Sequence, residues 1–283
     1  MRIDARRRDL GGLEVRRVLP SARCRRVGPF VFFDHMGPLR LAPGQGFDLP
    51  PHPHIALATL TFLFEGEIVH RDSTGATQPI RPGDVNWMVA GSGIAHSERS
   101  SDEARRAGAF MHGIQTWVAL PQNDEECEPS FEHHPAATLP TIVRPGLRLD
   151  VIAGEAYGAR SPVGVRSPTL YVHATLEAGA ALELDSRYPE RAVYVVEGGV
   201  SLQGGTLQAG AMLVVDSEVQ APLRSDEGCR LMLIGGEPLE SERHIWWNFV
   251  SSSRDRIERA KEDWKEGRFP KVPGDDEFIP LPE

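Results

Sequence analysis

Two short stretches of this chain carry side chains that commonly bind metal ions. Residues 51–54 read Pro-His-Pro-His, and residues 96–98 read His-Ser-Glu. Residues i and i+2 of a β-strand point to the same face, so each stretch would present two such side chains to one side. Three imidazoles and one carboxylate form a suitable set of protein ligands for a divalent ion. The candidate ligands are His52, His54, His96 and Glu98.

The sequence between these stretches predicts the elements that would position them. Residues 57–64 are rich in β-branched and aromatic side chains, and residues 85–90 form the next expected strand. Residues 81–84 read Arg-Pro-Gly-Asp, in which Pro82 presets φ and Gly83 accepts the positive φ of a type II turn. We therefore expect short antiparallel strands joined by tight turns, with the ligand pairs on facing strands.

The second half of the chain repeats this plan in a weaker form. Residues 193–200 resemble residues 61–68, 132 positions earlier. A period of that size indicates a duplicated domain and not a solenoid. The same offset places Leu184 and Ser186 where the first half has its His-x-His pair. The second copy is therefore expected to keep the scaffold and to bind no metal.

Length, charge and cysteine content limit the class of protein. A chain of 283 residues is long for one hydrophobic core, so two domains are expected. The net charge of −9 disfavours nonspecific nucleic-acid binding but leaves a protein partner open. No apolar run is long enough for a signal peptide or a membrane span. The cysteines are few and widely spaced, at positions Cys24, Cys127 and Cys229, which favours a reducing compartment. We therefore expect a cytoplasmic protein, and we expect it to be a monomer.

One clear helix is expected near the C-terminus, at about residues 254–266. Serines at 251–253 can cap its first turn, and Gly267 can end it. Apolar residues recur at helical spacing along one face. The remaining sequence predicts an all-β protein, with an N-terminal metal-binding domain at 1–132 and a degenerate second domain plus the helix at 133–283.

Several segments together resemble the pirin family of the cupin superfamily. They are residues 33–38, 51–55, 61–72, 81–88, 93–99 and 243–252. The resemblance implies two stacked cupin domains, each a double-stranded β-helix or jelly roll. It also implies one divalent metal held by the counterparts of the four candidate ligands. Iron is the commonest metal of the family, although three nitrogens and one oxygen also admit Mn, Co, Ni, Cu or Zn.

The resemblance implies quercetin 2,3-dioxygenase activity, in which O2 opens the ring of a flavonol, a small planar enol, and carbon monoxide is released. The alternative hypothesis is a redox-sensitive regulatory protein that acts through a protein partner. A third hypothesis is a cupin that catalyses a non-redox reaction. Glu98 would serve as a ligand alone, or also as the general base. Candidate pocket residues, for which core packing is the competing role, are His35, Phe33, Phe47, Phe62 and Met88. The other histidines, including His70, are expected to be structural.

Overall fold

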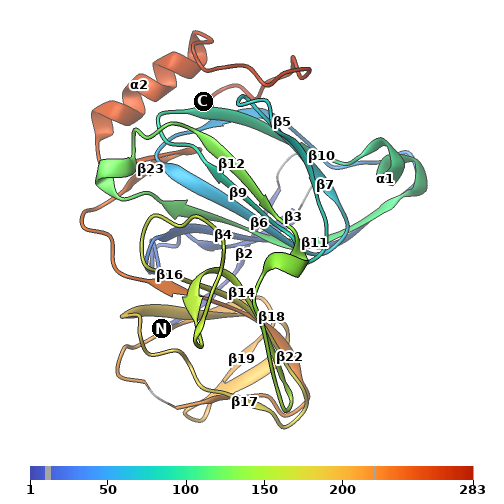
Figure 1. Cartoon of the computed structure of the whole chain (residues 1–283), viewed down its shortest axis with the longest axis vertical. Coiled ribbons are helices and arrows are strands. Elements are labelled where there is room, and N and C mark those ends of the chain that lie inside the picture. The colour runs from blue at the N-terminus through green and yellow to red at the C-terminus, as the bar shows by residue number, and fades with distance from the viewer. Residues whose placement is uncertain (10–13, 220, 283) are drawn as a thin grey trace. The chain divides into compact units, whose positions relative to one another are not determined.

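The computed structural model describes residues 1–9, 14–219 and 221–282. The chain is built mainly of antiparallel strands, which confirms the all-β prediction (Figure 1). It forms two compact units, each made of separate segments. Unit 1 comprises Met1–Arg7, Arg16–Asp34 and Ala137–Leu239, and unit 2 comprises Arg8–Val15, His35–Ala136 and Glu240–Glu283. The division of the sequence into domains at residue 132 stays a prediction.

A four-stranded antiparallel sheet in unit 2 carries both candidate ligand stretches. Its strand order is β5-β10-β7-β8. The bounds are β5 Asp48–His54, β10 Ile94–Arg99, β7 Ile68–Asp72 and β8 Thr77–Ile80. Because β10 lies between β5 and β7, side chains of β10 have cross-strand neighbours on both sides.

A second sheet has the order β12-β9-β6-β11-β4-β3-β2, and its first four strands lie wholly in unit 2. The bounds are β12 Ser130–His134, β9 Val85–Val89, β6 Leu57–Glu65, β11 Ala109–Ala119, β4 Phe30–Leu41, β3 Glu14–Leu19 and β2 Arg6–Asp9. The expected strands at 57–64 and 85–90 are therefore confirmed as β6 and β9. They are antiparallel neighbours, and Thr61 lies opposite Asn86.

Tight turns join these strands, one of them at the predicted residues 81–84. Gly83 has φ +83°, and the Asp84 amide donates to the Arg81 carbonyl at 3.0 Å, which closes the predicted turn. Gly66, between β6 and β7, has φ +92°. A Cβ atom on Gly66 would lie 2.0 Å from the Phe110 carbonyl oxygen. Only glycine fits there, because both the backbone conformation and the space exclude a side chain.

Unit 1 contains an 11-stranded sheet whose main path is β1-β20-β18-β22-β16-β14-β13. Four short strands, β15, β17, β19 and β21, pair beside this path. The bounds are β1 Arg2–Asp4, β13 Thr141–Arg144, β14 Leu147–Ala156, β15 Ala159–Arg160, β16 Thr169–Leu176, β17 Ala181–Leu182, β18 Glu190–Leu202, β19 Gly205–Gln208, β20 Ala211–Val215, β21 Leu223–Arg224 and β22 Cys229–Gly236. The repeated segment of the sequence, residues 193–200, thus lies within strand β18.

The remaining elements are short. They are β23 His244–Trp246, β24 Phe249–Ser251, α1 Asp102–Ala107, α2 Arg254–Lys265, and the 3₁₀ turns η1 Gln122–Asp124 and η2 Ala136–Thr138. Helix α2 confirms the predicted C-terminal helix and belongs to unit 2. The Ser253 hydroxyl caps it by accepting from the Arg256 amide. No helix among the described residues is long and apolar enough to cross a membrane.

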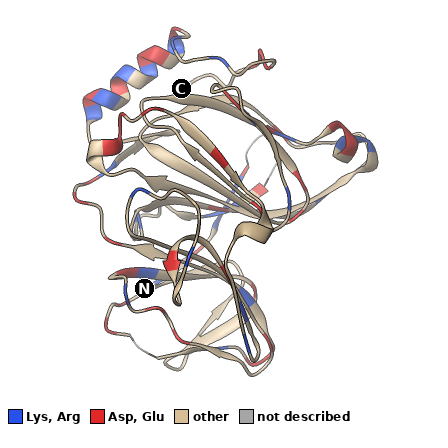
Figure 2. Ribbon diagram, in the orientation of Figure 1, with Lys and Arg blue, Asp and Glu red and all other residues tan. Residues whose placement is uncertain are grey.

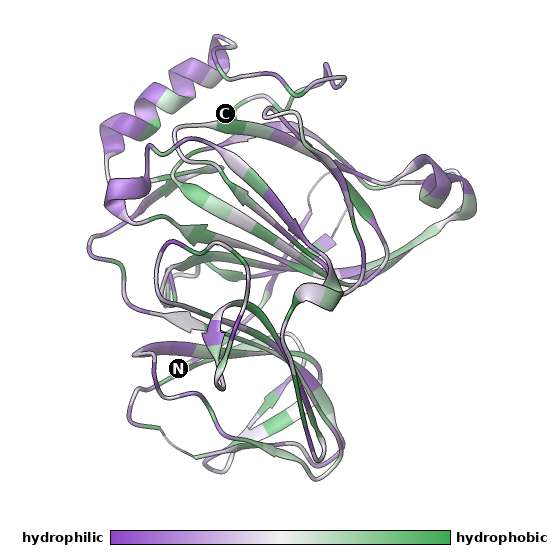
Figure 3. Ribbon diagram, viewed as in Figure 1, coloured by the Kyte–Doolittle hydropathy of each residue, from purple (hydrophilic) through white to green (hydrophobic). Residues whose placement is uncertain are grey.

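Apolar side chains fill the interior of each unit separately. Figure 3 shows apolar residues along the strands and a largely hydrophilic α2. Figure 2 shows that α2 carries charges of both signs. In unit 2 one buried cluster comprises Val15, Met36, Phe47, Leu63, Ile68, Ile80 and Met111. Another includes Ile257 and Ala260 of α2, packed against Phe249 of β24. The three cysteines are free thiols.

Candidate metal centre

Three imidazoles converge in the interior of unit 2. His52 and His54 lie on β5, and His96 lies directly opposite His52 on β10. One nitrogen from each ring lies within 4.8 Å of the other two. All three side chains are buried. The alternation of side chains along two neighbouring strands brings these three residues together, as the His-x-His and His-x-Glu spacing predicts.

Backbone carbonyls orient two of the three rings. The Nδ1–H of His52 donates to the Pro50 carbonyl at 2.9 Å, and the Nδ1–H of His54 donates to the Asn248 carbonyl at 3.0 Å. These tautomers follow from the partners, because a carbonyl oxygen can only accept. Each ring therefore keeps its Nε2 lone pair, which is the form that binds a metal.

The spacing of the ring nitrogens suits a divalent ion. The Nε2 atoms of His54 and His96 are 3.1 Å apart. Two imidazole nitrogens about 2.1 Å from one ion and about 90° apart would be separated by about 3.0 Å. The residues present therefore fit a divalent metal ion.

Burial keeps these histidines neutral. It lowers the pKa of His52 from 6.5 to about 4, and it lowers the pKa values of His54 and His96 well below that of an ordinary histidine. Neighbouring imidazoles of the cluster lower the latter two further, since a second positive charge would be repelled. At neutral pH no proton has to leave these rings before a metal binds.

Glu98 is buried in the same unit but stands apart from the group of three nitrogens. Its two carboxylate oxygens accept from the Gln115 amide at 2.9 and 3.0 Å, and one also accepts from the Thr61 hydroxyl at 3.4 Å. Burial raises the pKa of Glu98, while these hydrogen bonds oppose the rise. The β5–β10 pairing is irregular between His96 and Glu98, where β5 has one residue more than β10. The β7–β10 pairing is regular there, so Glu98 and His96 share one face of β10.

The predicted pocket residues are found in several environments. Thr61 faces Glu98, so Phe62, the next residue of β6, points to the opposite face of that sheet. His35 is buried against His112, with their Nε2 atoms 2.8 Å apart. Phe33 packs in unit 1, where its ring centroid is 4.8 Å from that of Tyr194.

Met88 and Phe47, the other two predicted pocket residues, lie in different surroundings. Met88 lies opposite Thr59 on β6, and Thr59 shares a face with Thr61, so Met88 is on the face that Glu98 contacts. Phe47 is one of the buried apolar residues of the cluster around Leu63. Strand pairing thus assigns Met88 to this face, and alternation along β6 also places Leu63, whose cluster contains Phe47, on the face of Thr61.

Sequence reasoning did not identify several residues that surround the cluster. Trp117 of β11 is almost fully buried, and its ring centroid is 5.1 Å from that of His54. Gln115, two residues before it on the same strand, holds Glu98. Their i, i+2 spacing is a usable signal, because both must point to one face of β11. His70, expected to be structural, lies with its Nδ1 atom 3.3 Å from that of His96.

The β23–β24 hairpin, which supplies the carbonyl partner of His54, is held by a buried carboxylate. Glu125 pairs with the buried Arg243 at 2.9 Å and accepts from the Ser251 hydroxyl at 2.8 Å. The Ser252 amide also donates to Glu125. Removing one partner of a buried charge pair is costly, so this cluster fixes the hairpin and hence the support of His54.

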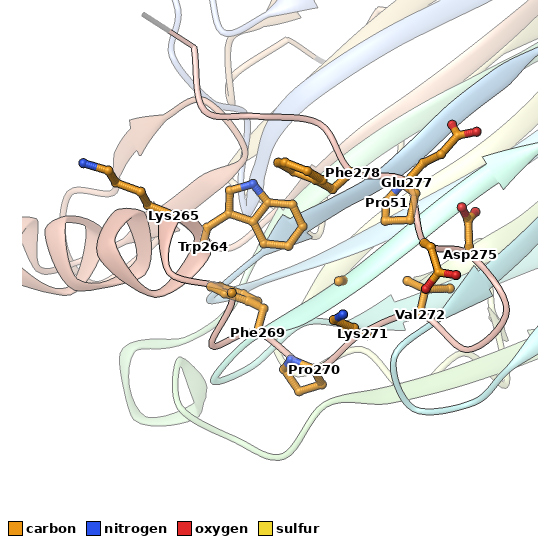
Figure 4. A pocket seen from close by; sticks show the side chains of 13 residues that line it. Pro51, Trp264, Lys265, Phe269, Pro270, Lys271, Val272, Asp275, Glu277 and Phe278 are labelled. Carbon is orange, nitrogen blue, oxygen red and sulfur yellow. The ribbon is translucent and has the colours of Figure 1, made fainter.

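A cavity of about 330 Å³ lies on the other face of the β5–β10 pair (Figure 4). Pro51 and Ala95 line it, and each alternates along its strand with a histidine of the cluster. The C-terminal segment forms the remaining wall, where Trp264, Phe269 and Phe278 lie around one end. This cavity is therefore separate from the space that the three imidazoles enter.

The fold and the site define a cupin-type protein with a three-histidine centre in one unit. Family models described as Pirin and as the Pirin C-terminal cupin domain match residues 12–118 and 171–270. The "Pirin-like protein" of Caulobacter vibrioides is 53% identical over 99% of this chain and 98% of the relative. This chain belongs to the pirin family.

Two further similarities concern proteins with quercetinase names. A Pseudomonas aeruginosa protein named "Putative quercetin 2,3-dioxygenase PA1205" is 38% identical, over 94% of this chain and 84% of its own length. The crystal structure of "Quercetin 2,3-dioxygenase from Acinetobacter baumannii" superposes with a TM-score of 0.92 at 34% identity. It covers 100% of this chain and 95% of the other. The likeness thus extends over the whole chain.

Proposed function

We propose that this protein is a mononuclear, metal-dependent dioxygenase that acts on a planar enol of the flavonol class, as a quercetin 2,3-dioxygenase does. The observation that carries the proposal is the convergence of three buried, neutral imidazoles in the unit that also buries Glu98. Relatives with quercetinase names over most of the chain support the substrate class.

His52, His54 and His96 would hold the ion through their Nε2 atoms, and Glu98 is the candidate fourth ligand. A bound divalent ion, with iron the leading candidate, supplies a Lewis-acid centre for the deprotonated 3-hydroxyl of a flavonol. Glu98 would have to turn from Gln115 to become a ligand, because its oxygens are outside the group of three nitrogens.

Glu98 is also the candidate proton acceptor. Its raised pKa makes the carboxylate a stronger base than an exposed glutamate, and general bases work best when their pKa approaches the working pH. The Gln115 amide would steady the carboxylate while one oxygen takes the proton of the substrate hydroxyl. Trp117, beside His54, offers an apolar wall for a planar ring and helps to exclude water.

The test is O2 uptake and carbon monoxide release with quercetin, measured on protein reconstituted with Fe, Mn, Co, Ni or Cu. The expected result is equal amounts of O2 consumed and carbon monoxide released, with neither in metal-free protein or in His54→Ala. Glu98→Gln separates the two roles of Glu98: retained metal with lost turnover assigns the base, whereas lost metal assigns the ligand. Protein that binds metal but never consumes O2 refutes the proposal and favours the regulatory alternative.

A further inference from the structure

Two buried side chains outside the predicted ligand set form a hydrogen-bonded chain that ends at His96. The Nε2 atom of His70 is 2.8 Å from Oδ2 of Asp72, and the Nδ1 atom of His70 is 3.3 Å from Nδ1 of His96. Asp72 is fully buried, and His70 and His96 are nearly so. The β7–β10 register sets Asp72 opposite His96 and His70 opposite Glu98, so His70 reaches His96 diagonally across the two strands.

The local structure fixes the orientation of the Asp72 carboxylate. Its Oδ1 accepts from the Thr74 amide at 2.8 Å and from the Thr74 hydroxyl at 2.6 Å, and the Ala76 amide adds a longer bond. These donors occupy one oxygen and leave Oδ2 for His70. The His70 ring is held from another side by Phe131, which stacks on it with centroids 4.4 Å apart and planes at 13°.

For a neutral His70, counting donors along this chain gives the tautomers. An ionised carboxylate can only accept, so the Nε2 atom of His70 carries the proton that it donates to Asp72. A neutral His70 then has a lone pair on Nδ1, which can only accept from the Nδ1–H of His96. His96 in that tautomer keeps its Nε2 lone pair, which points toward Nε2 of His54.

His96 differs in this respect from the other two rings of the cluster. His52 and His54 donate their Nδ1–H groups to backbone carbonyls. His96 has a side chain as its partner, so its support can be removed by substitution without changing the backbone. Ring orientation and tautomer of metal-binding histidines depend on such outer partners, whose loss typically weakens metal binding about 10–100-fold.

We propose that His70 and Asp72 are positioning residues that hold His96 as its Nδ1–H tautomer, with the Nε2 lone pair directed at the metal position. This inference rests on the metal site of the proposed function. Without the acceptor on His70, the better arrangement for His96 in metal-free protein is to place the proton on Nε2 and donate it to Nε2 of His54. That proton would then block the metal position until the ring changed tautomer.

The test combines His70→Phe with two measurements. Phenylalanine keeps a ring on Phe131 but removes both nitrogens. The first measurement is the 15N NMR spectrum of the histidine rings in metal-free protein. We expect His96 to be protonated on Nδ1 in the wild type and on Nε2 in His70→Phe. The second is the Zn²⁺ dissociation constant from competition with a chelator, which should rise about 10–100-fold. Asp72→Asn should give a smaller change in the same direction.

His134→Phe is the matched control. His134 also donates to a carboxylate two residues away on its strand, Glu132, at 2.9 Å. The His134→Phe substitution should leave the Zn²⁺ affinity and the tautomer of His96 unchanged. His70→Gln, whose amide oxygen can accept from Nδ1–H of His96, should restore part of the affinity, which a purely structural role would not predict.

The results separate this inference from the proposed function. Wild-type protein that binds no Zn²⁺, Fe²⁺ or Mn²⁺ refutes the metal site, while the tautomer measurement still tests the role of His70. Wild-type protein that binds metal with His96 protonated on Nε2 in its metal-free form overturns the inference and leaves the metal site standing. Equal Zn²⁺ affinities in folded wild type and His70→Phe overturn it as well. If His70→Phe fails to fold, Asp72→Asn and the wild-type spectrum provide the same decision.

Discussion

Acidification of the metal-free protein should unfold unit 2 by protonating the buried histidines. The pKa of His52 falls from 6.5 to about 4 on folding. Between these pH values the unfolded chain binds a proton at His52 and the folded chain does not. The free energy of unfolding therefore decreases as the pH falls, by about 1.4 kcal/mol per pH unit for each such group. Between pH 6.5 and 4, protonation linked to His52 alone lowers the free energy of unfolding by about 3 kcal/mol. His54 and His96 lower it further.

The assay is urea unfolding of chelator-treated protein at a series of pH values from 7.5 to 4.5. Tryptophan fluorescence suits it, because all five tryptophans belong to unit 2. His52→Asn is the comparison, since the asparagine amide can still donate to the Pro50 carbonyl but does not titrate. Below pH 6.5 the wild-type curve should be steeper by about 1.4 kcal/mol per pH unit. Equal slopes for both proteins would refute the argument that a buried, neutral His52 is present in the metal-free fold.

Three further outcomes are expected. His54→Ala should weaken divalent-metal binding by more than about 100-fold, because it removes a ligand and not merely its support, while the circular dichroism spectrum is retained. Unchanged affinity in a chelator competition would contradict the assignment. Elemental analysis should give one tightly held ion per chain, since Leu184 and Ser186 stand in place of the His-x-His pair in the second copy. Two tightly held ions would contradict the prediction that the second copy binds no metal. Asp275→Asn should release the C-terminal segment at a cost of about 1–3 kcal/mol, because it weakens the 2.9 Å ion pair with Arg99. Hydrogen exchange of that segment measures the effect, and unchanged protection would argue against it.

The candidate site illustrates which kinds of contact a sequence can reveal. His-x-His and His-x-Glu spacing predicts shared faces, since side-chain direction alternates along any strand. Partners distant in the sequence leave no such mark. The Asn248 carbonyl orients His54 across 194 positions, and it belongs to the backbone of a hairpin that Glu125 and Arg243 hold in place.

His70 shows the same limit at shorter range. The sequence places it on a strand with Asp72, two residues away, so the pair could be expected on one face. Only the β7–β10 register brings the pair against His96. Phe62 shows the converse, because it is a predicted pocket residue and alternation along β6 directs its ring to the face opposite Thr61.

The sequence by itself determined the strand-rich fold, the turn at Gly83, the C-terminal helix and the grouping of His52, His54 and His96. These depend on local φ/ψ preferences and on side-chain periodicity, which are properties of short segments. Tertiary structure alone decided the grouping of separate segments into two units, the ring tautomers and the Glu98–Gln115 contact. Those features depend on strand register and burial, which set distances, hydrogen-bond partners and pKa values only after the chain has folded.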